Sequence, residues 1–286
     1  MKLGLHVPDF TWPGGPVSLG PDLAEVARAA DEAGFEYLSV MDHFFQIRVV
    51  GPAEKDMLEA YTTLGFLAAH TERINLLTLV TGVHYRQPGL LAKAITTLDV
   101  LSGGRAVFGI GAGWNEEESR GLGFPFPPLK ERFEMLEETL RYVRQMWSDD
   151  ERPFKSAHID AERLLNVPQP LRKPHPPIMI GGSGEKKTLR FVAKYADACN
   201  LFPGPNLVRK LDVLRGHCDA EGRDYTEITK TTTAPLDPTK LDDFKADLRR
   251  QAEMGIDAAF VRIPGGPKPD LIDVFAREVI PEAAGY

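Results

Sequence analysis

Short apolar runs alternate with helical patterns from one end of the chain to the other. The runs are six to ten residues long, which is typical of buried strands. Each is followed by apolar residues spaced three or four apart, as in an amphipathic helix. The predicted strands are KLGLHV (2–7), YLSVMDH (37–43), RINLLTLVTG (73–82), AVFGIGAG (106–113), PIMIGG (177–182), DACNLF (197–202), EITKTTT (227–233) and AAFVRI (258–263). The alternation therefore predicts eight strand-helix units.

Proline and glycine predict where two of the helices begin and end. Pro21 suits the first turn of the helix over 20–34, and Gly34 suits its C-terminal cap. Pro88 is expected to open the helix that follows the third strand and stops before Gly103.

Apolar strands separated by helices are typical of a parallel sheet covered on both faces. Eight units in 286 residues favour an α/β fold of the (β/α)8 TIM-barrel class, with an open doubly wound sheet as the alternative. We expect a single domain over residues 1–286. The region 114–177 is too long for one unit, so we predict an insertion after strand four, of the kind that often forms a lid or binding loop.

Composition and charge argue against several classes of protein. Apolar residues make up 43% and charged residues 26%, as in soluble globular proteins, and no apolar run is long enough for a membrane span. The opening segment MKLGLHVPDF lacks the long apolar region of a signal peptide, so a cytoplasmic location is expected. A net charge of −7 argues against a nucleic-acid partner. Two cysteines and seven scattered histidines predict no metal site.

In a TIM barrel the active site lies at the carboxyl ends of the strands. The second strand ends in Asp42 and His43. An imidazole titrates near neutral pH, so this pair is the strongest candidate for acid-base work, although both residues are equally suited to capping the next segment. The last three strand ends, at 200–203, 231–233 and 262–266, are less telling.

Two glycine-rich turns lie at the ends of the fourth and fifth strands. Gly109, Gly111 and Gly113 fall on one face of their strand, which leaves space for a ligand or for bulky neighbours. The fifth strand runs into IGGSGEKKT, whose glycines and following helix N-terminus suit either a phosphate or a tight turn. The glutamates at 116–118 are expected to start a helix.

Other side chains offer further alternatives. Lys230 in the seventh strand is a candidate for a Schiff base, or a structural lysine. Trp12, Tyr85 and Trp114 are expected near the barrel mouth, where they suit a flat aromatic ligand or pack the insertion against the barrel.

These segments resemble those of the bacterial luciferase-like superfamily, specifically its coenzyme F-420 (deazaflavin) oxidoreductases. The most specific matches are YLSVMDHF, LLTLVTGVHYRQPGLLAKAITTLDVLSGGRAVFGIGAGWNEEE and PPIMIGGSGEKKTLR, and the likeness runs almost end to end. The resemblance implies a luciferase-like (β/α)8 barrel with an insertion beyond strand four, and a homodimer.

The resemblance also implies roles for individual residues. Asp42 and His43 would face the deazaflavin ring, with the histidine as proton donor or hydride-transfer stabiliser. The peptide between Gly82 and Val83 would support the back of the ring and is cis in relatives. The remaining implied contacts are with strand four at Gly111, Ala112 and Gly113, with the cofactor phosphate at Gly181, Gly182 and Ser183, and with the substrate pocket at Trp12, Tyr85, Trp114 and Asn115.

The chain departs from the sugar-phosphate dehydrogenases of that branch. They carry a catalytic glutamate at the position of Trp114, and Glu117 and Glu118 are displaced from it, so sugar-phosphate oxidation is not expected. The resemblance implies hydride transfer between F-420 and a small alcohol, ketone, imine or activated alkene. The alternatives are an FMN-dependent monooxygenase and a flavin-binding protein without catalysis.

Overall fold

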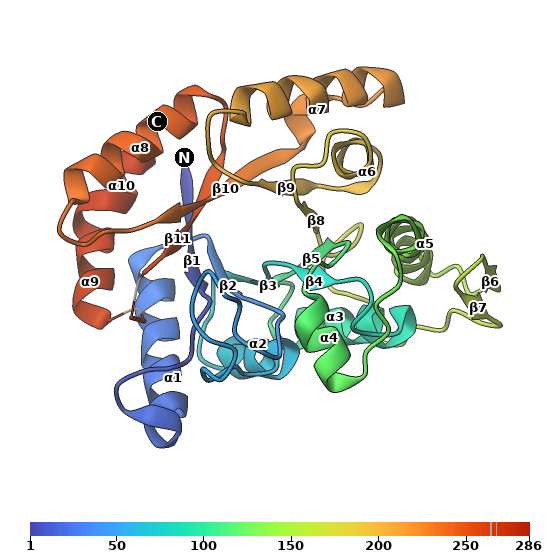
Figure 1. Ribbon diagram of the computed structural model, residues 1–286, viewed down its shortest axis with the longest axis horizontal. Helices are drawn as coiled ribbons and strands as arrows, with labels where there is room; N and C mark the ends of the chain where they lie inside the picture. Colours follow the sequence, from blue (N-terminus) through green and yellow to red (C-terminus); the bar gives the residue numbers. More distant parts are fainter. Residues whose placement is uncertain (264, 267) are drawn as a thin grey trace.

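The computed structural model describes residues 1–263, 265–266 and 268–286, so residue 264 of the eighth strand end lies outside the described residues. Eight parallel strands form the centre of the molecule (Figure 1). They are β1 (Lys2–Val7), β2 (Tyr37–Val40), β3 (Asn75–Thr78), β5 (Ala106–Gly111), β8 (Ile178–Gly181), β9 (Ala198–Leu201), β10 (Thr229–Pro235) and β11 (Ala258–Arg262). Each falls within a predicted run except β10, which extends two residues past its run of 227–233.

The sheet closes into a barrel because β3 also pairs with β5, at Leu76 with Ala106 and at Leu77 with Val107. The α/β fold is therefore the predicted luciferase-like (β/α)8 barrel, and the open-sheet alternative is wrong. The third predicted strand is interrupted after β3, and a two-residue strand, β4 (Thr81–Gly82), resumes the pairing with β5.

Helices surround the barrel (Figure 1). They are α1 (Gly15–Ala33), α2 (Ala60–Ala68), α3 (Pro88–Leu101), α4 (Glu116–Leu122), α5 (Leu129–Met146), α6 (Thr188–Tyr195), α7 (Leu207–Glu221), α8 (Leu241–Glu253), α9 (Pro269–Val274) and α10 (Ile280–Ala283), with a 3-10 turn at Tyr225–Glu227 and a π-helical turn at Phe275–Val279. Gly34 caps α1 with a φ of 89°, as predicted. The prediction for Pro21 is wrong, because α1 begins at Gly15 and Pro16 takes the first-turn position.

The apolar core has two parts. The larger part packs the outward side chains of the strands against the helices. A smaller cluster fills the barrel interior and consists of Leu77, Val107, Met179, Ala198 and Phe260. The ring of Phe260 requires glycine at position 4, since a Cβ there would lie 2.7 Å from a ring carbon. Side chains thus fill this part of the barrel interior.

Between β5 and β8 the chain forms α4, α5 and a small hairpin, β6 (Phe154–Lys155) with β7 (Asp160–Ala161), which projects from the barrel (Figure 1). Helix α5 buries Leu136, Leu140 and Val143, which lie on one face at helical spacing. Among the described residues, no helix combines the length and apolar character needed to cross a bilayer.

Candidate active site

A cavity of about 780 Å³ opens at the carboxyl ends of the barrel strands. All eight strand ends contribute to its lining, which is mainly apolar and includes Leu79, Val80 and Trp114. This size and composition are typical of small-molecule sites. Nine of the candidate residues line the cavity: His43, Gly82, Tyr85, Gly111, Ala112, Gly113, Trp114, Gly181 and Gly182.

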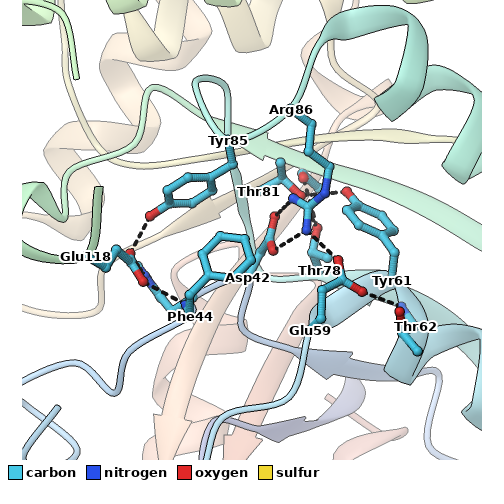
Figure 2. Close-up of polar contacts among 12 residues, drawn as sticks. Asp42, Phe44, Glu59, Tyr61, Thr62, Thr78, Thr81, Tyr85, Arg86 and Glu118 are labelled. Atoms are coloured by element: carbon cyan, nitrogen blue, oxygen red, sulfur yellow. Dashed lines mark hydrogen bonds and ion pairs between the residues drawn. The ribbon is translucent and has the colours of Figure 1, made fainter. Parts of the chain in front are cut away.

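Glu118 is the residue that organises the site around His43. Figure 2 shows its contacts with Tyr85 and Phe44. Its carboxylate is fully buried, and Oε1 accepts a hydrogen bond of 2.5 Å from Nδ1 of His43 and another from the hydroxyl of Tyr85. Its Oε2 accepts from the backbone amides of Phe44 and Phe45, at 2.7 Å and 3.2 Å. Four donors converge on one carboxylate, which satisfies its acceptors without water.

This arrangement fixes the chemistry of the imidazole. Burial alone would raise the pKa of Glu118, but the hydrogen bonds from His43, Tyr85 and the Phe44 amide outweigh burial and lower it. Glu118 is therefore an anion, and the proton in its bond with His43 belongs to Nδ1. Burial and the Glu118 contact raise the pKa of Tyr85, so its hydroxyl stays protonated and donates. Nε2 of His43 is left for a ligand in the cavity, since no described residue bonds to it.

Asp42 does not face the cavity beside His43 as the resemblance implies. It is buried and forms two hydrogen bonds with the guanidinium of Arg86, at 2.5 Å and 2.9 Å, and Arg86 also contacts Glu59 at 2.5 Å (Figure 2). Burial opposes the charge on Arg86, but the bonds to Asp42 outweigh it and raise the pKa of Arg86. Arg86 also stacks on Tyr61, 4.6 Å from the ring centre. This network fixes the segment after β2 that carries His43.

The structure corrects the place of the cis peptide. The non-prolyl cis bond joins Leu79 and Val80, not Gly82 and Val83. Val83 is instead a core residue whose amide donates to the carbonyl of Gly111 at 3.0 Å. Leu79 and Val80, which lie between β3 and β4, both line the cavity.

Val80 and its neighbours also explain the glycines of β5 and β8. A Cβ at Gly109 would lie 1.9 Å from the carbonyl oxygen of Thr78, and a Cβ at Gly181 would lie 2.7 Å from Val80. At Gly111 the distance to Val80 would be 3.2 Å. These glycines therefore make room for bulky neighbours within the protein, which was one of the two interpretations of the glycine pattern.

Gly113 serves a different neighbour. Its φ is +73°, and a Cβ there would lie 2.5 Å from Nδ1 of His84. His84 bonds through Nε2 to the hydroxyl of Ser119 at 2.9 Å, and burial lowers its pKa to about 4. The buried, neutral His84 therefore joins α4 to the strand that carries the glycines.

Besides Asp42, four candidate residues are not among the described residues that line the cavity. Trp12 is buried and donates through its ring nitrogen to the carbonyl of Asp9 at 2.9 Å. Asn115 is buried at the start of α4, where its carbonyl accepts from the hydroxyl of Ser119. Ser183 accepts from the amide of Phe202 at 3.1 Å. The fourth is Val83.

Lys230 lies at the opposite end of the barrel. It is near the start of β10, it pairs with Asp257 at 2.9 Å and stacks over Tyr225, and it does not line the cavity. Lys230 therefore lies outside the cavity at the strand ends, which argues against the Schiff-base interpretation.

The sequence analysis missed Glu118, Val80 and Arg262 as parts of the site. One feature of the sequence could have indicated Glu118. It lies in the first turn of a helix that begins at Glu116, just after the glycine-rich strand end, so its side chain can point towards β2. Arg262, at the last strand end, lines the cavity. Among the described residues no group of three or more His, Cys, Asp or Glu side chains is arranged to hold a metal ion.

Comparisons with known proteins identify the family. Residues 1–261 match the model of a family described as luciferase-like monooxygenase. An uncharacterized protein of Mycobacterium tuberculosis is 30% identical over 256 residues, 84% of this chain and 86% of its own. An F-420-dependent glucose-6-phosphate dehydrogenase of Kineococcus radiotolerans is 30% identical over 219 residues, 75% of this chain and 63% of its own.

Two further matches are a monooxygenase and a solved structure. A dimethylsulfone monooxygenase of Pseudomonas putida that depends on reduced FMN is 30% identical over 159 residues, 56% of this chain and 42% of its own. The solved structure of an F-420-dependent secondary alcohol dehydrogenase with an F-420–acetone adduct superposes with a TM-score of 0.82 at 18% identity, covering 99% of this chain and 98% of that one. That likeness shows a shared fold.

Proposed function

This chain belongs to the luciferase-like monooxygenase family, and on that premise we propose that it transfers a hydride between coenzyme F-420 and a small organic substrate. Membership of the family, with dehydrogenase relatives, makes the protein an oxidoreductase. The observation that carries the finer proposal is His43, whose Nδ1 is held by the buried Glu118 while its ring lines a largely apolar cavity.

The residues of the cavity fit a flat ring with an anionic tail. Leu79, Val80 and Ala112 supply apolar surface, and Gly111 lines the cavity beside Val80. Past β8 the amides of Ser183 and Gly184 donate to no acceptor among the described residues, so this turn remains available for a phosphate. Gly82, Gly113, Gly181 and Gly182 complete the proposed cofactor contacts.

A bound deazaflavin supplies a ring carbon that gives or takes a hydride and reacts poorly with oxygen. The protein then has two tasks, to orient the substrate and to handle one proton. In the direction of reduction, Nε2 of protonated His43 gives its proton to the substrate atom that becomes negative as hydride arrives. In the direction of oxidation, neutral Nε2 takes the hydroxyl proton as hydride leaves. Glu118 stabilises the imidazolium in both directions.

The proposed positions of the aromatic residues follow from the same geometry. Trp114 lies edge-on to His43 with ring centres 5.4 Å apart. By the family resemblance, it stands where the sugar-phosphate dehydrogenases carry a glutamate. An indole at this position favours a less polar substrate than a sugar. Tyr85 supports Glu118 rather than the substrate.

Titration of the purified protein with oxidised F-420 and with FMN, followed by Trp fluorescence, tests the cofactor. We expect F-420 to bind at least tenfold more tightly than FMN, and Trp114→Phe to lose most of the fluorescence change, because Trp114 lines the cavity and Trp12 does not. A preference for FMN would overturn the proposal in favour of the monooxygenase alternative, which the Pseudomonas putida relative represents.

His43→Ala tests the proton role. The variant is expected to keep its affinity for F-420 within about threefold while turnover of an active substrate falls by roughly 100-fold or more, as is usual when an acid-base group is removed. Turnover equal to that of the unchanged protein would reject His43 as the proton-handling residue.

A further inference from the structure

Arg262 is the one formally charged side chain of the cavity lining among the described residues. It is the last residue of β11, and β11 pairs with β1 so that Arg262 lies beside His6. The lining includes no aspartate, glutamate or lysine, although the whole chain carries a net charge of −7. The cavity therefore has a positive charge that its own walls do not neutralise.

Arg262 also lacks a hydrogen-bond or ion-pair partner for its guanidinium within residues 1–263, 265–266 and 268–286. The other arginines near the site are paired: Arg86 with Asp42 and Glu59, and Arg48 with Glu117 at 3.0 Å. A half-buried guanidinium loses part of its hydration, and without a carboxylate partner no interaction offsets this loss. Such a group is stabilised when a ligand brings the missing anion.

His6 does not supply that anion and does not compete for it. Its Nδ1 bonds to the hydroxyl of Ser39 at 2.9 Å, and burial, with a smaller effect from Arg262, lowers its pKa to about 4. It is a neutral ring beside the guanidinium near pH 7. One side of the cavity thus combines a single cation with an uncharged hydrogen-bonding group.

The position of Arg262 separates it from the turn proposed for the cofactor phosphate. That turn follows β8, three strands away from β11 in the sheet order, at about 4.8 Å per strand. His43 follows β2, only two strands from β11 on the other side. Arg262 is thus nearer in strand order to His43 than to that turn, and both side chains line the same cavity.

We infer that Arg262 binds an oxyanion group, a carboxylate or a phosphate, at one end of the substrate, whose other end is apolar. The inference rests on the proposed function only in naming the bound molecule as the substrate. The planar fork of an arginine matches both oxyanions with two parallel hydrogen bonds. The same cavity is also lined by the apolar side chains of Met41, Ile47 and Val49, which suit an alkyl or aryl body rather than a sugar.

Calorimetric titration of the full chain with cinnamate, phenyl phosphate and the neutral cinnamamide tests this site. We expect Arg262→Gln to weaken binding of the preferred anion by roughly 10–100-fold and to leave cinnamamide within twofold, since a hydrogen-bonded charge pair of this kind contributes that much. The two anions tell which oxyanion the site prefers. Arg262→Lys keeps the positive charge but loses the planar fork of the guanidinium. Its affinity for the anion is expected to lie between those of the unchanged protein and Arg262→Gln.

Arg48→Gln is the matched control. It removes the same charge from the segment that lines the cavity at Ile47 and Val49, but its side chain points to solvent and pairs with Glu117. It is expected to bind both anions as the unchanged protein does. Equal weakening by both substitutions would reduce the effect to net charge and overturn the inference.

Two other results would also overturn it. The first is that neither anion binds the unchanged protein more tightly than cinnamamide. The second is that Arg262→Gln lowers the affinity for F-420 by as much as the affinity for the anion, which would assign Arg262 to the cofactor. The anion titration needs no cofactor, so the two proposals are tested independently. A preference for FMN would reject the proposed function, but it would not change what the titration says about Arg262.

Discussion

At the scale of single residues, one carboxylate determines how His43 behaves. Glu118 has no exposed surface, and an isolated charge there would cost several kcal/mol. Two backbone amides, one hydroxyl and one imidazole offset that cost. The same four bonds orient the imidazole, so stability and function depend on the same atoms.

Glu118→Gln is therefore expected to affect both properties. A glutamine keeps an oxygen for the amides of Phe44 and Phe45 but presents an NH2 group to Nδ1 of His43, which reverses the tautomer. We expect turnover to fall on the order of 100-fold, with F-420 affinity nearly unchanged, and the free energy of unfolding to fall by about 1–3 kcal/mol. Steady-state kinetics and urea denaturation measure the two effects.

The stability difference should depend on pH. The pKa of Glu118 is lowered from 4.5 on folding, so the charged carboxylate stabilises the folded protein fully above about pH 4.5. As pH falls through the lower folded-state pKa, the carboxylate is protonated and the advantage over glutamine disappears. A difference between the two proteins that stays constant down to pH 3 would contradict this assignment.

At the scale of elements, β5 is shaped by what β3 and β8 place beside it. The carbonyl of Thr78 and the side chain of Val80 occupy the space that side chains on Gly109, Gly111 and Gly181 would need. The close approach lets the bend after β3 reach the cavity. The glycine pattern is therefore a requirement of strand packing before it is a feature of ligand binding.

Gly109→Ala is expected to lower the free energy of unfolding by more than about 3 kcal/mol, or to prevent folding, because the new Cβ meets a backbone oxygen that has no freedom to move. Gly216→Ala is the matched control. Gly216 lies on the exposed side of α7 with nothing within 4 Å of the new Cβ, so alanine should stabilise the helix by about 1 kcal/mol. Thermal denaturation of both variants tests this prediction. Equal stabilities of Gly109→Ala and Gly216→Ala would contradict the packing argument.

At the scale of the whole molecule, the barrel brings all eight strand ends to one cavity. Apolar side chains are also exposed on the outer surface of the protein. Leu101 at the end of α3 is 72% exposed, and so is Val167 in the segment that Lys93 joins to the same helix by a 2.8 Å hydrogen bond. Exposed apolar groups of this kind are often covered by a partner.

The homodimer implied by the family resemblance remains a prediction. The chain has a mass of 31.7 kDa, and light scattering at micromolar concentration is expected to give twice that value. Leu101→Lys places a charge on this apolar surface and should lower the measured mass if α3 contributes to the interface. A mass of 31.7 kDa for the unchanged protein would contradict the prediction.

The sequence by itself determined the order and kind of the elements. Strand runs such as AVFGIGAG and caps such as Gly34 depend on local periodicity and backbone preference, which a chain carries in any environment. Because the barrel collects its strand ends at one mouth, the sequence also located the site and named His43, Trp114 and Gly111 near it.

Tertiary structure alone decided which side chains meet there. Asp42 and His43 are adjacent in sequence, yet Asp42 turns to Arg86 while His43 turns to Glu118, 75 residues away. The bend at Leu79 and Val80 was likewise hidden within an unbroken apolar run. Sequence patterns report local preferences, whereas the pairing of buried charges and the packing of strands depend on distances that exist only after the barrel has closed.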